Sequence, residues 1–244
     1  PEQASALASA FWPGPLTLVL ERKSIVPHLV TAGLPTLGIR CPDHPLTRLL
    51  LEKLEFPLAA PSANPFGYIS PTTPGHVESQ LGANIPYILD GGSCEIGIES
   101  TIVGFINGKG IVMRTGGLAI EEIERVTVKL ELQLNIFSNP KAPGQLQSHY
   151  APRKTLVVGD LDTIISKYPA AKIAVLSFQK NYHAPVQVIL SPSGNLEEAA
   201  HNFFSGLRTL DESPAELILA GYVPDIGLGR AINDRLRRAA YISH

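Results

Sequence analysis

Residues 101–117 read TIVGFINGKGIVMRTGG, a stretch that indicates the fold class. It holds two short apolar runs, 101–105 and 111–114, that are expected to form strands. Similar runs elsewhere predict strands at 16–20, 37–40, 58–60 and 88–90, and helices are expected from Pro45, from Pro74 and over 119–126. Short strands that alternate with short helices are typical of a mixed α/β sheet and not of a helix bundle or a β-sandwich.

The second half of the chain repeats the alternation after a break. Between 131 and 153 the apolar periodicity fails, and residues 138–144, SNPKAPG, favour turns and extended backbone. Strands are expected after it at 155–159, 172–178 and 186–190, with helices at 161–167, 195–210 and 228–240. The pattern predicts a domain over 1–130, a linker over 131–153 and a smaller doubly wound α/β domain over 154–244.

The composition favours a small-molecule substrate. The chain is 44% hydrophobic and 17% charged with a net charge of −2, so it lacks the excess of basic residues that is typical of a nucleic-acid-binding protein. Cys41 and Cys94 show no spacing typical of a disulfide framework or a zinc site. No apolar run is long enough to span a bilayer and no leader pattern begins the chain. We expect a cytoplasmic protein with no membrane contact and no stable nucleic-acid binding.

Standard catalytic signatures are absent from the sequence. It contains no GxxxxGK[ST] phosphate loop, no complete GxGxxG, and neither GxSxG nor HExxH. The nearest candidate, residues 227–229 (GLG), needs no ligand if it is a helix-entry turn. Three unusual loops remain as candidates for a site.

The first loop, residues 57–67, reads PLAAPSANPFG. Its prolines restrict the backbone, so Ser62 and Asn64 could be held ready to hydrogen-bond a phosphate or carboxylate at little ordering cost. The alternative is a proline-rich turn in which both side chains bond only the local backbone.

The other two loops lie at strand ends. Residues 90–101, DGGSCEIGIEST, combine three glycines, which could form an anion-binding nest, with the hydroxyls of Ser100 and Thr101; a plain glycine-rich hairpin is the alternative. Arg114 ends one expected strand and Arg40 ends another, and arginine at a sheet end offers a charged fork for phosphate. A solvated strand-end arginine is the alternative for both.

Six short segments together are specific. They are 12–17 (WPGPLT), 38–42 (GIRCP), 60–64 (APSAN), 99–103 (ESTIV), 114–116 (RTG) and 143–152 (PGQLQSHYAP). In this order they resemble the YrdC-like threonylcarbamoyl-AMP synthase family in its long, two-domain form. The resemblance implies a YrdC-like twisted mixed sheet with helices and a smaller C-terminal Rossmann-like α/β domain.

The resemblance also implies a function. Members of this family are nucleotidyltransferases that make L-threonylcarbamoyladenylate from L-threonine, bicarbonate and ATP, releasing pyrophosphate, for the threonylcarbamoyladenosine modification of transfer RNA. Their product passes to a downstream threonylcarbamoyl transferase machinery. Mg²⁺ is expected with ATP, held mainly by phosphate oxygens and water, so no protein metal ligand and no catalytic nucleophile or base is named.

Site residues carry over from the matching segments. The resemblance implies ATP contacts at Thr36, Ser62, Asn64, Ser70, Arg114, His149 and Tyr150. It implies L-threonine contacts at Arg40, Ala60, Ser100 and Thr101. In longer members the connector closes over the site, so residues 145–151 are expected to act as a lid, or alternatively as a tether whose histidine and tyrosine pack on the second domain.

The sequence departs from the family pattern at its start. The family's early strand and turn with threonine and tyrosine, and its Lys/Arg phosphate motif, precede the region seen here, so we expect the catalytic domain to be N-terminally incomplete.

Two other functions stay open. One is a non-catalytic YrdC-like module that binds RNA or nucleotides, supported by Arg230, Arg235, Arg237 and Arg238. On a helix these arginines project to different sides, which favours a solvated face over an RNA-binding one. The other is carbamoyl transfer in protein maturation, which the absence of acylphosphatase-like and zinc-finger segments opposes.

Overall fold

The computed structural model describes residues 1–133 and 149–241. The described residues form two compact units, one of 1–61 with 99–133 and the other of 62–98 with 149–241. The units are defined by contacts between residues, whereas the domain boundaries at 130 and 154 were predicted from the sequence pattern. Those domain boundaries therefore stay a prediction. Most of the expected linker, 134–148, lies outside the described residues.

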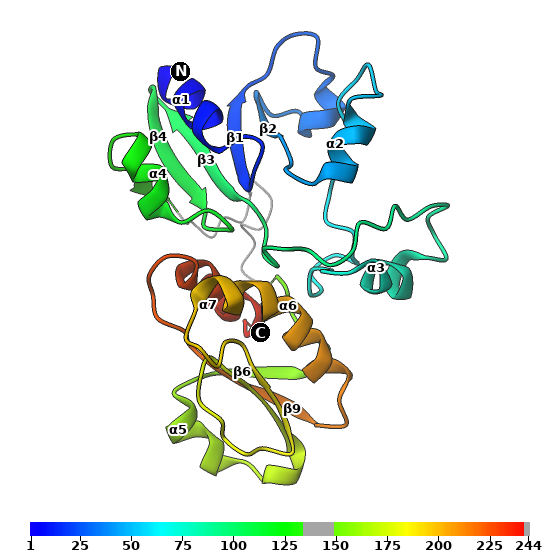
Figure 1. The fold of residues 1–244 in the computed structure, drawn as a ribbon, viewed down its shortest axis with the longest axis vertical. Helices are drawn as coiled ribbons and strands as arrows, with labels where there is room; N and C mark the ends of the chain where they lie inside the picture. Colours follow the sequence, from blue (N-terminus) through cyan, green and yellow to red (C-terminus); the bar gives the residue numbers. More distant parts are fainter. Residues whose placement is uncertain (134–148, 242–244) are drawn as a thin grey trace. The chain divides into compact units, whose positions relative to one another are not determined.

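The first unit is built on a mixed five-stranded sheet of order β2-β1-β3-β4-β5 (Figure 1). Its strands are β1 (Leu16–Glu21), β2 (Thr36–Arg40), β3 (Thr101–Ile106), β4 (Lys109–Arg114) and β5 (Glu131–Leu132). β1 pairs with β3 and β4 with β5 in parallel, while β1 with β2 and β3 with β4 are antiparallel. The mixed sheet predicted from residues 101–117 and the runs around them is confirmed.

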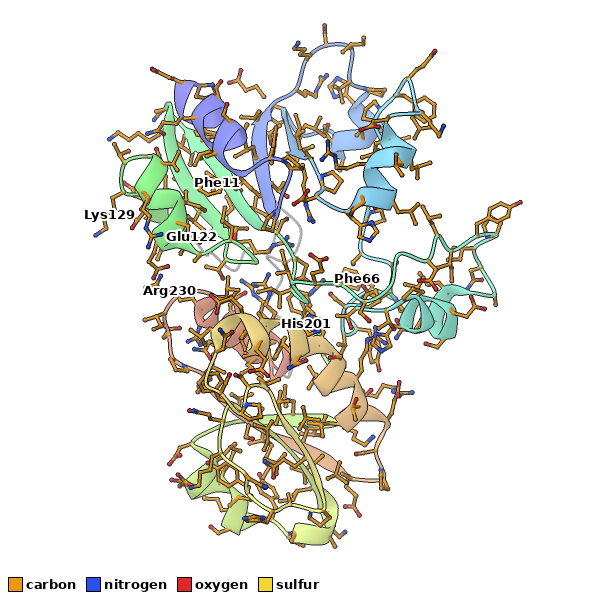
Figure 2. All side chains as sticks on the ribbon, viewed as in Figure 1. Phe11, Phe66, Glu122, Lys129, His201 and Arg230 are labelled. Atoms are coloured by element: carbon orange, nitrogen blue, oxygen red, sulfur yellow. The ribbon has the colours of Figure 1, made fainter. Side chains whose placement is uncertain are left out.

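Helices cover one face of this sheet and form the core. They are α1 (Glu2–Phe11) and α4 (Ile120–Val126), with α2 (Pro45–Leu51) and the 3₁₀ turn η1 (His28–Thr31) elsewhere in the unit. Leu16 and Leu18 alternate along β1, so both point to the same face and pack with Leu7 of α1 and Ile123 of α4. Phe11, labelled in Figure 2, packs against this cluster from the end of α1.

The second unit contains a fully parallel sheet of order β6-β9-β7-β8. Its strands are β6 (Thr155–Gly159), β7 (Ile173–Ser177), β8 (Val186–Ile189) and β9 (Leu217–Gly221). Its helical elements are α3 (Pro74–Leu81), α5 (Leu161–Ile164), α6 (Leu196–Glu212), α7 (Gly229–Ala239) and the 3₁₀ turns η2 (Ile165–Lys167) and η3 (Ala170–Lys172). The small Rossmann-like layer is confirmed, and β9 is a strand that the sequence analysis missed.

Alternating residues of β7 separate the two faces of the parallel sheet. Ile173 and Val175 pack with Leu161 of α5. On the other face a Cβ added to Gly206 of α6 would lie 2.8 Å from Val188 and 3.5 Å from Leu176. Helix α6 therefore packs closely on β7 and β8, on the face opposite α5.

Two expected strands are wrong. Residues 58–60 and 88–90 are irregular, and Leu58 and Leu89 are exposed to 48% and 59%. Pro57 lies next to the first stretch and Pro86 close to the second, and proline cannot donate to a strand ladder. The expected helix at 161–167 divides into α5 and the turn η2.

Helix starts follow the sequence signals closely. Thr73 caps α3 and its hydroxyl accepts from the His76 N–H at 3.2 Å, with Pro74 in the first turn. α7 begins at Gly229, so residues 227–229 do lead into a helix.

Candidate functional site

Arg114 and Ser100 are joined at one edge of the first unit's sheet. Ile102 of β3 pairs with Arg114 at the end of β4, which places Arg114 beside the entrance of β3. The Ser100 carbonyl accepts from Arg114 Nε at 3.1 Å and from Nη2 at 2.8 Å, and Nη2 lies 3.2 Å from Ser100 Oγ. Arg114 is only 7% exposed, so the alternative of a solvated strand-end arginine is wrong for this residue.

Thr17 forms a polar cluster with Ser100 and Arg114. Its hydroxyl lies 2.7 Å from Ser100 Oγ, and β1 carries it alongside β3 in parallel. Ser100 Oγ thus has Thr17 on one side and Arg114 on the other. Thr17 was not predicted to be a site residue, although it ends the WPGPLT segment.

Arg40 lies at the same edge and Thr36 does not. Arg40 pairs across β1 with Thr17, and its Nε donates to the Gly14 carbonyl at 3.1 Å. Thr36 pairs with Glu21 at the other end of β2, roughly 13 Å along the strand by its rise per residue. Ala60 is exposed in the irregular stretch that follows Pro57.

Thr101 has an internal partner for its hydroxyl. Oγ1 donates to the Leu118 carbonyl at 2.6 Å and accepts from the Leu118 N–H at 3.1 Å, and the residue is fully buried. Both bonds fix the turn after Arg114. A contact of Thr101 with L-threonine stays a prediction.

The second unit contains the other expected nucleotide residues. Ser62 is exposed, Asn64 half-buried and Ser70 buried. Asn64 Nδ2 donates to the carbonyls of Pro65 at 2.8 Å and Tyr68 at 3.1 Å, as the local-turn alternative expected. Its Oδ1 is buried, with no hydrogen-bond partner among the described residues, so Asn64 keeps an acceptor for a ligand.

His149 and Tyr150 lie against the C-terminal helices. Tyr150 is 1% exposed, and its ring centroid is 5.4 Å from that of Phe204 on α6. The His149 ring stands edge-on to it at 4.0 Å. This is the packing that the tether alternative expected of the tyrosine, while a contact with nucleotide stays a prediction. Residues 145–148 of the expected lid lie outside the described residues.

Two of the four arginines at α7 do not lie on the expected solvated face, while Arg237 is exposed. Arg235 is fully buried and Arg238 is 4% exposed. Both pair with Asp234, at 3.3 Å and 3.0 Å. The expectation placed them on a solvated face because helical spacing alone does not show which side of a helix is covered. These two side chains are not available to a basic RNA-binding surface.

In the described part of the chain, no helix is long and apolar enough to cross a membrane. Nor do residues 1–133 and 149–241 hold any group of three or more histidine, cysteine, aspartate and glutamate side chains suited to a metal ion.

Fold and polar groups together describe a two-domain α/β protein whose first sheet ends in a buried arginine and hydroxyls. Two family models match it: one for the Sua5/YciO/YrdC family, described as "Telomere recombination", over residues 1–116, and one described as "Threonylcarbamoyl-AMP synthase, C-terminal domain" over residues 118–241.

Whole proteins match over nearly all of the chain. The threonylcarbamoyl-AMP synthase of Pyrococcus abyssi is 37% identical over 98% of this chain and 74% of its own length. That of Bacillus subtilis is 36% identical over 98% of the chain and 73% of its length. The chain belongs to the threonylcarbamoyl-AMP synthase family. The enzyme class and the activity expected from its motifs, synthesis of threonylcarbamoyl-AMP, are confirmed.

Solved structures agree with the fold. The crystal structure of P. abyssi Sua5 complexed with L-threonine matches with a TM-score of 0.90 at 37% identity, covering 98% of this chain and 74% of that one. A variant of the same protein, in which an adjacent histidine and tyrosine are replaced by alanine, matches with a TM-score of 0.89.

Proposed function

We propose that this enzyme binds L-threonine with Arg40, Ala60, Ser100 and Thr101, and ATP with Arg114 together with Thr36, Ser62, Asn64, Ser70, His149 and Tyr150. The observation that carries the proposal is the tie between Arg114 and Ser100, which brings a buried cation and a hydroxyl to one sheet edge. The L-threonine complex of the P. abyssi relative supports an amino-acid subsite in this fold.

Arg114 suits a phosphate because its orientation is set before any ligand arrives. Nε and Nη2 both donate to the Ser100 carbonyl, which fixes the plane of the guanidinium. A fixed cation in a buried place stabilises developing negative charge without reorganisation. Arg114 is therefore assigned to the phosphates, and the Ser100 hydroxyl beside it to the threonine.

The reaction needs alignment more than a protein nucleophile. The threonine amine forms a C–N bond with carbon dioxide or bicarbonate, giving the carbamate with loss of a proton or of water. A carbamate oxygen then attacks the α-phosphate of ATP, the new P–O bond forms, and the P–O bond to pyrophosphate breaks. The chain's own residues hold the reactants in line and place positive charge against the phosphates.

Mg²⁺ would arrive with ATP. The assigned residues offer hydroxyls, an amide, an imidazole and guanidinium groups and no carboxylate, so the metal would be coordinated mainly by triphosphate oxygens and water. It would neutralise charge on the leaving pyrophosphate. The product is a mixed anhydride of a carbamate and AMP, an activated group that suits transfer by a downstream threonylcarbamoyl transferase.

Pyrophosphate release tests the proposal. The purified protein, given L-threonine, bicarbonate, ATP and Mg²⁺, is expected to release pyrophosphate and to form a product with the mass of threonylcarbamoyl-AMP. Omitting threonine or bicarbonate should abolish both signals. Binding of ATP with no product under any of these conditions would contradict the function and favour a non-catalytic nucleotide-binding module.

A further inference from the structure

We infer that helix α6 of the C-terminal domain positions the nucleotide side of the active site, with Arg208 and Asp211 as positioning residues for the loop at 62–70. The inference rests on the proposed assignment of Ser62, Asn64 and Ser70 to ATP. It gives the C-terminal domain a role that neither its fold nor its family name states.

Helix α6 has two occupied faces. Gly206 faces β7 and β8, as the close approach of Val188 and Leu176 shows. A second stripe, at positions 201, 204, 208 and 211, follows helical spacing and contacts segments outside the C-terminal sheet. Phe204 of this stripe packs on Tyr150. The helix therefore joins its own sheet to chain segments that come from elsewhere in the sequence.

Arg208 fixes the backbone at Ser70. Its Nε donates to the Ser70 carbonyl at 3.2 Å, and its Nη2 donates to the Ile69 carbonyl and to Gln80 Oε1, the latter at 3.1 Å. Arg208 is 2% exposed. One planar fork that bonds two successive carbonyls fixes both the position and the direction of the chain there.

Asp211 fixes the loop one step earlier, at Tyr68. The Tyr68 hydroxyl donates to Asp211 Oδ2 at 2.7 Å, and the same carboxylate accepts from Arg153 Nε and the Lys154 N–H, each at 3.0 Å. Burial, followed by the Asp211 hydrogen bond, raises the pKa of Tyr68 to about 12, so the phenol stays protonated and keeps donating. The Tyr68 carbonyl in turn accepts from Asn64 Nδ2 at 3.1 Å.

The same stripe of α6 also contacts residues 95–97, near the end of the 62–98 segment. His201, labelled in Figure 2, lies with Nδ1 2.7 Å from the Glu95 carbonyl. A Cβ added to Gly97 would lie 2.4 Å from the carbonyl oxygens of Ala200 and His201, so the chain approaches α6 as closely as a glycine allows. α6 thus contacts the segment at 68–70 and again at 95–97.

These contacts favour a positioning role over simple packing. A buried charge is costly to desolvate, and apolar residues of similar volume would hold two surfaces together at least as well. Here each charge makes at least one hydrogen bond to a backbone or hydroxyl group of the loop that carries Ser62, Asn64 and Ser70, besides its bonds to Gln80, Arg153 and Lys154. The connected bonds run from Asp211 through Tyr68 to Asn64, and from Arg208 to Ser70.

Steady-state kinetics with two substrates separate positioning from folding. Arg208→Ala is expected to raise KM for ATP roughly tenfold or more, as for the loss of charge-assisted hydrogen bonds that hold a binding loop, with KM for L-threonine nearly unchanged. Arg208→Lys should recover part of the loss, because one ammonium can reach a carbonyl but cannot fork across two. Lys172→Ala, which breaks an exposed ion pair with Glu216 in the same domain, is the matched control and should leave both KM values unchanged.

Hydrogen exchange gives a second readout that needs no activity. In Arg208→Ala, amide exchange should accelerate at 68–72 while the strands of the C-terminal sheet keep their protection. Tyr68→Phe, which removes one hydroxyl and keeps the ring, provides a milder variant if Arg208→Ala does not fold; it should shift ATP affinity in the same direction by a smaller factor.

Each outcome decides a different point. A wild type that makes threonylcarbamoyl-AMP together with folded variants whose KM for ATP is unchanged would overturn the positioning role and leave the proposed function standing. Equal rises in both KM values, or unchanged exchange at 68–72, would also overturn it. A wild type that makes no product would remove the proposed function, and the positioning role with it.

Discussion

The expected site residues of the two units are held by different kinds of hydrogen bond. At the edge of the first sheet, Arg40, Thr17, Ser100 and Arg114 lie on or beside paired strands, so backbone ladders set their places. The 62–70 loop has no strand, and side chains of a helix more than a hundred residues later hold it. Strand register thus fixes the expected site residues of the first unit, whereas a helix distant in sequence fixes those of the second.

The largest expected effect is a loss of stability in the second unit, where Tyr150 packs on α6. Tyr150→Ala should lower the free energy of unfolding by about 3–5 kcal/mol, because it removes a buried aromatic ring that packs on Phe204. Denaturant unfolding measures this. Tyr150→Phe keeps the ring, so it should retain stability; a raised KM for ATP in that variant would show that the hydroxyl contacts nucleotide. Unchanged stability of Tyr150→Ala would contradict the packing.

The next largest expected effect is a loss of ATP affinity, through Arg114 of the first unit. Arg114→Ala should weaken ATP binding by about 1.5–3 kcal/mol, since a charge-assisted contact to phosphate is lost. Calorimetric titration with ATP measures it, and Arg125→Ala, an exposed arginine on α4, is the control. ATP affinity equal to that of the wild type in a folded Arg114→Ala protein would remove Arg114 from the site.

Lowering the pH tests how much the Asp211 carboxylate stabilises the second unit. Burial alone would raise the pKa of the Asp211 carboxyl, but hydrogen bonds from Tyr68, the Lys154 N–H and Arg153 hold it below its ordinary value. A depressed folded pKa stabilises the protein above the unfolded pKa, and that contribution is lost as pH falls through the folded value. Asp211→Asn should therefore cost about 1–2 kcal/mol at neutral pH, and the difference from wild type should shrink below pH of about 4.

Urea unfolding from pH 7 down to about 2.5 measures that difference. A gap between Asp211→Asn and wild type that stays constant across the whole range would show that the carboxylate is not the stabilising form.

The smallest expected effect separates the two substrates. Ser100→Ala should raise the requirement for threonine more than for ATP, and Ser62→Ala should do the reverse, each by about 0.5–1.5 kcal/mol for one neutral hydrogen bond. The Ser100 carbonyl, which holds Arg114, survives the first substitution. KM values for both substrates measure the effect, and equal shifts in all four cases would show that the division is wrong.

Local patterns allowed many elements to be predicted. The strand at 155–159 matches β6 at both ends, and the Thr73 cap is as expected. The apolar runs at 58–60 and 88–90 misled because the nearby prolines and the lack of a partner strand outweighed hydrophobicity. β9 lies in a stretch left unassigned, although its apolar run three residues after Pro214 was a usable signal.

The site was less accessible from sequence for a physical reason. Ser100 and Arg114 were named, but their contact depends on the register of β3 and β4, which a single sequence does not specify. Arg208 and Asp211 were not named, since their partners Ser70 and Tyr68 lie far away along the chain. Burial of Arg235 was misjudged because Tyr150, whose ring centroid lies 5.5 Å from Arg235 Cζ, comes from another segment of the chain.

Because α6 packs both on its own sheet and on residues 68–70 and 95–97, these parts of the chain should unfold cooperatively. A protein truncated after residue 130 would lack α6, which contacts residues 68–70 and 95–97. A fragment starting at 154 would expose Arg208 and Asp211 to water, because their partners Ser70 and Tyr68 would be missing. Neither piece would be an autonomous folding module in the sense that a two-domain sequence suggests. Residues 62–98 and the C-terminal domain should instead melt in one transition.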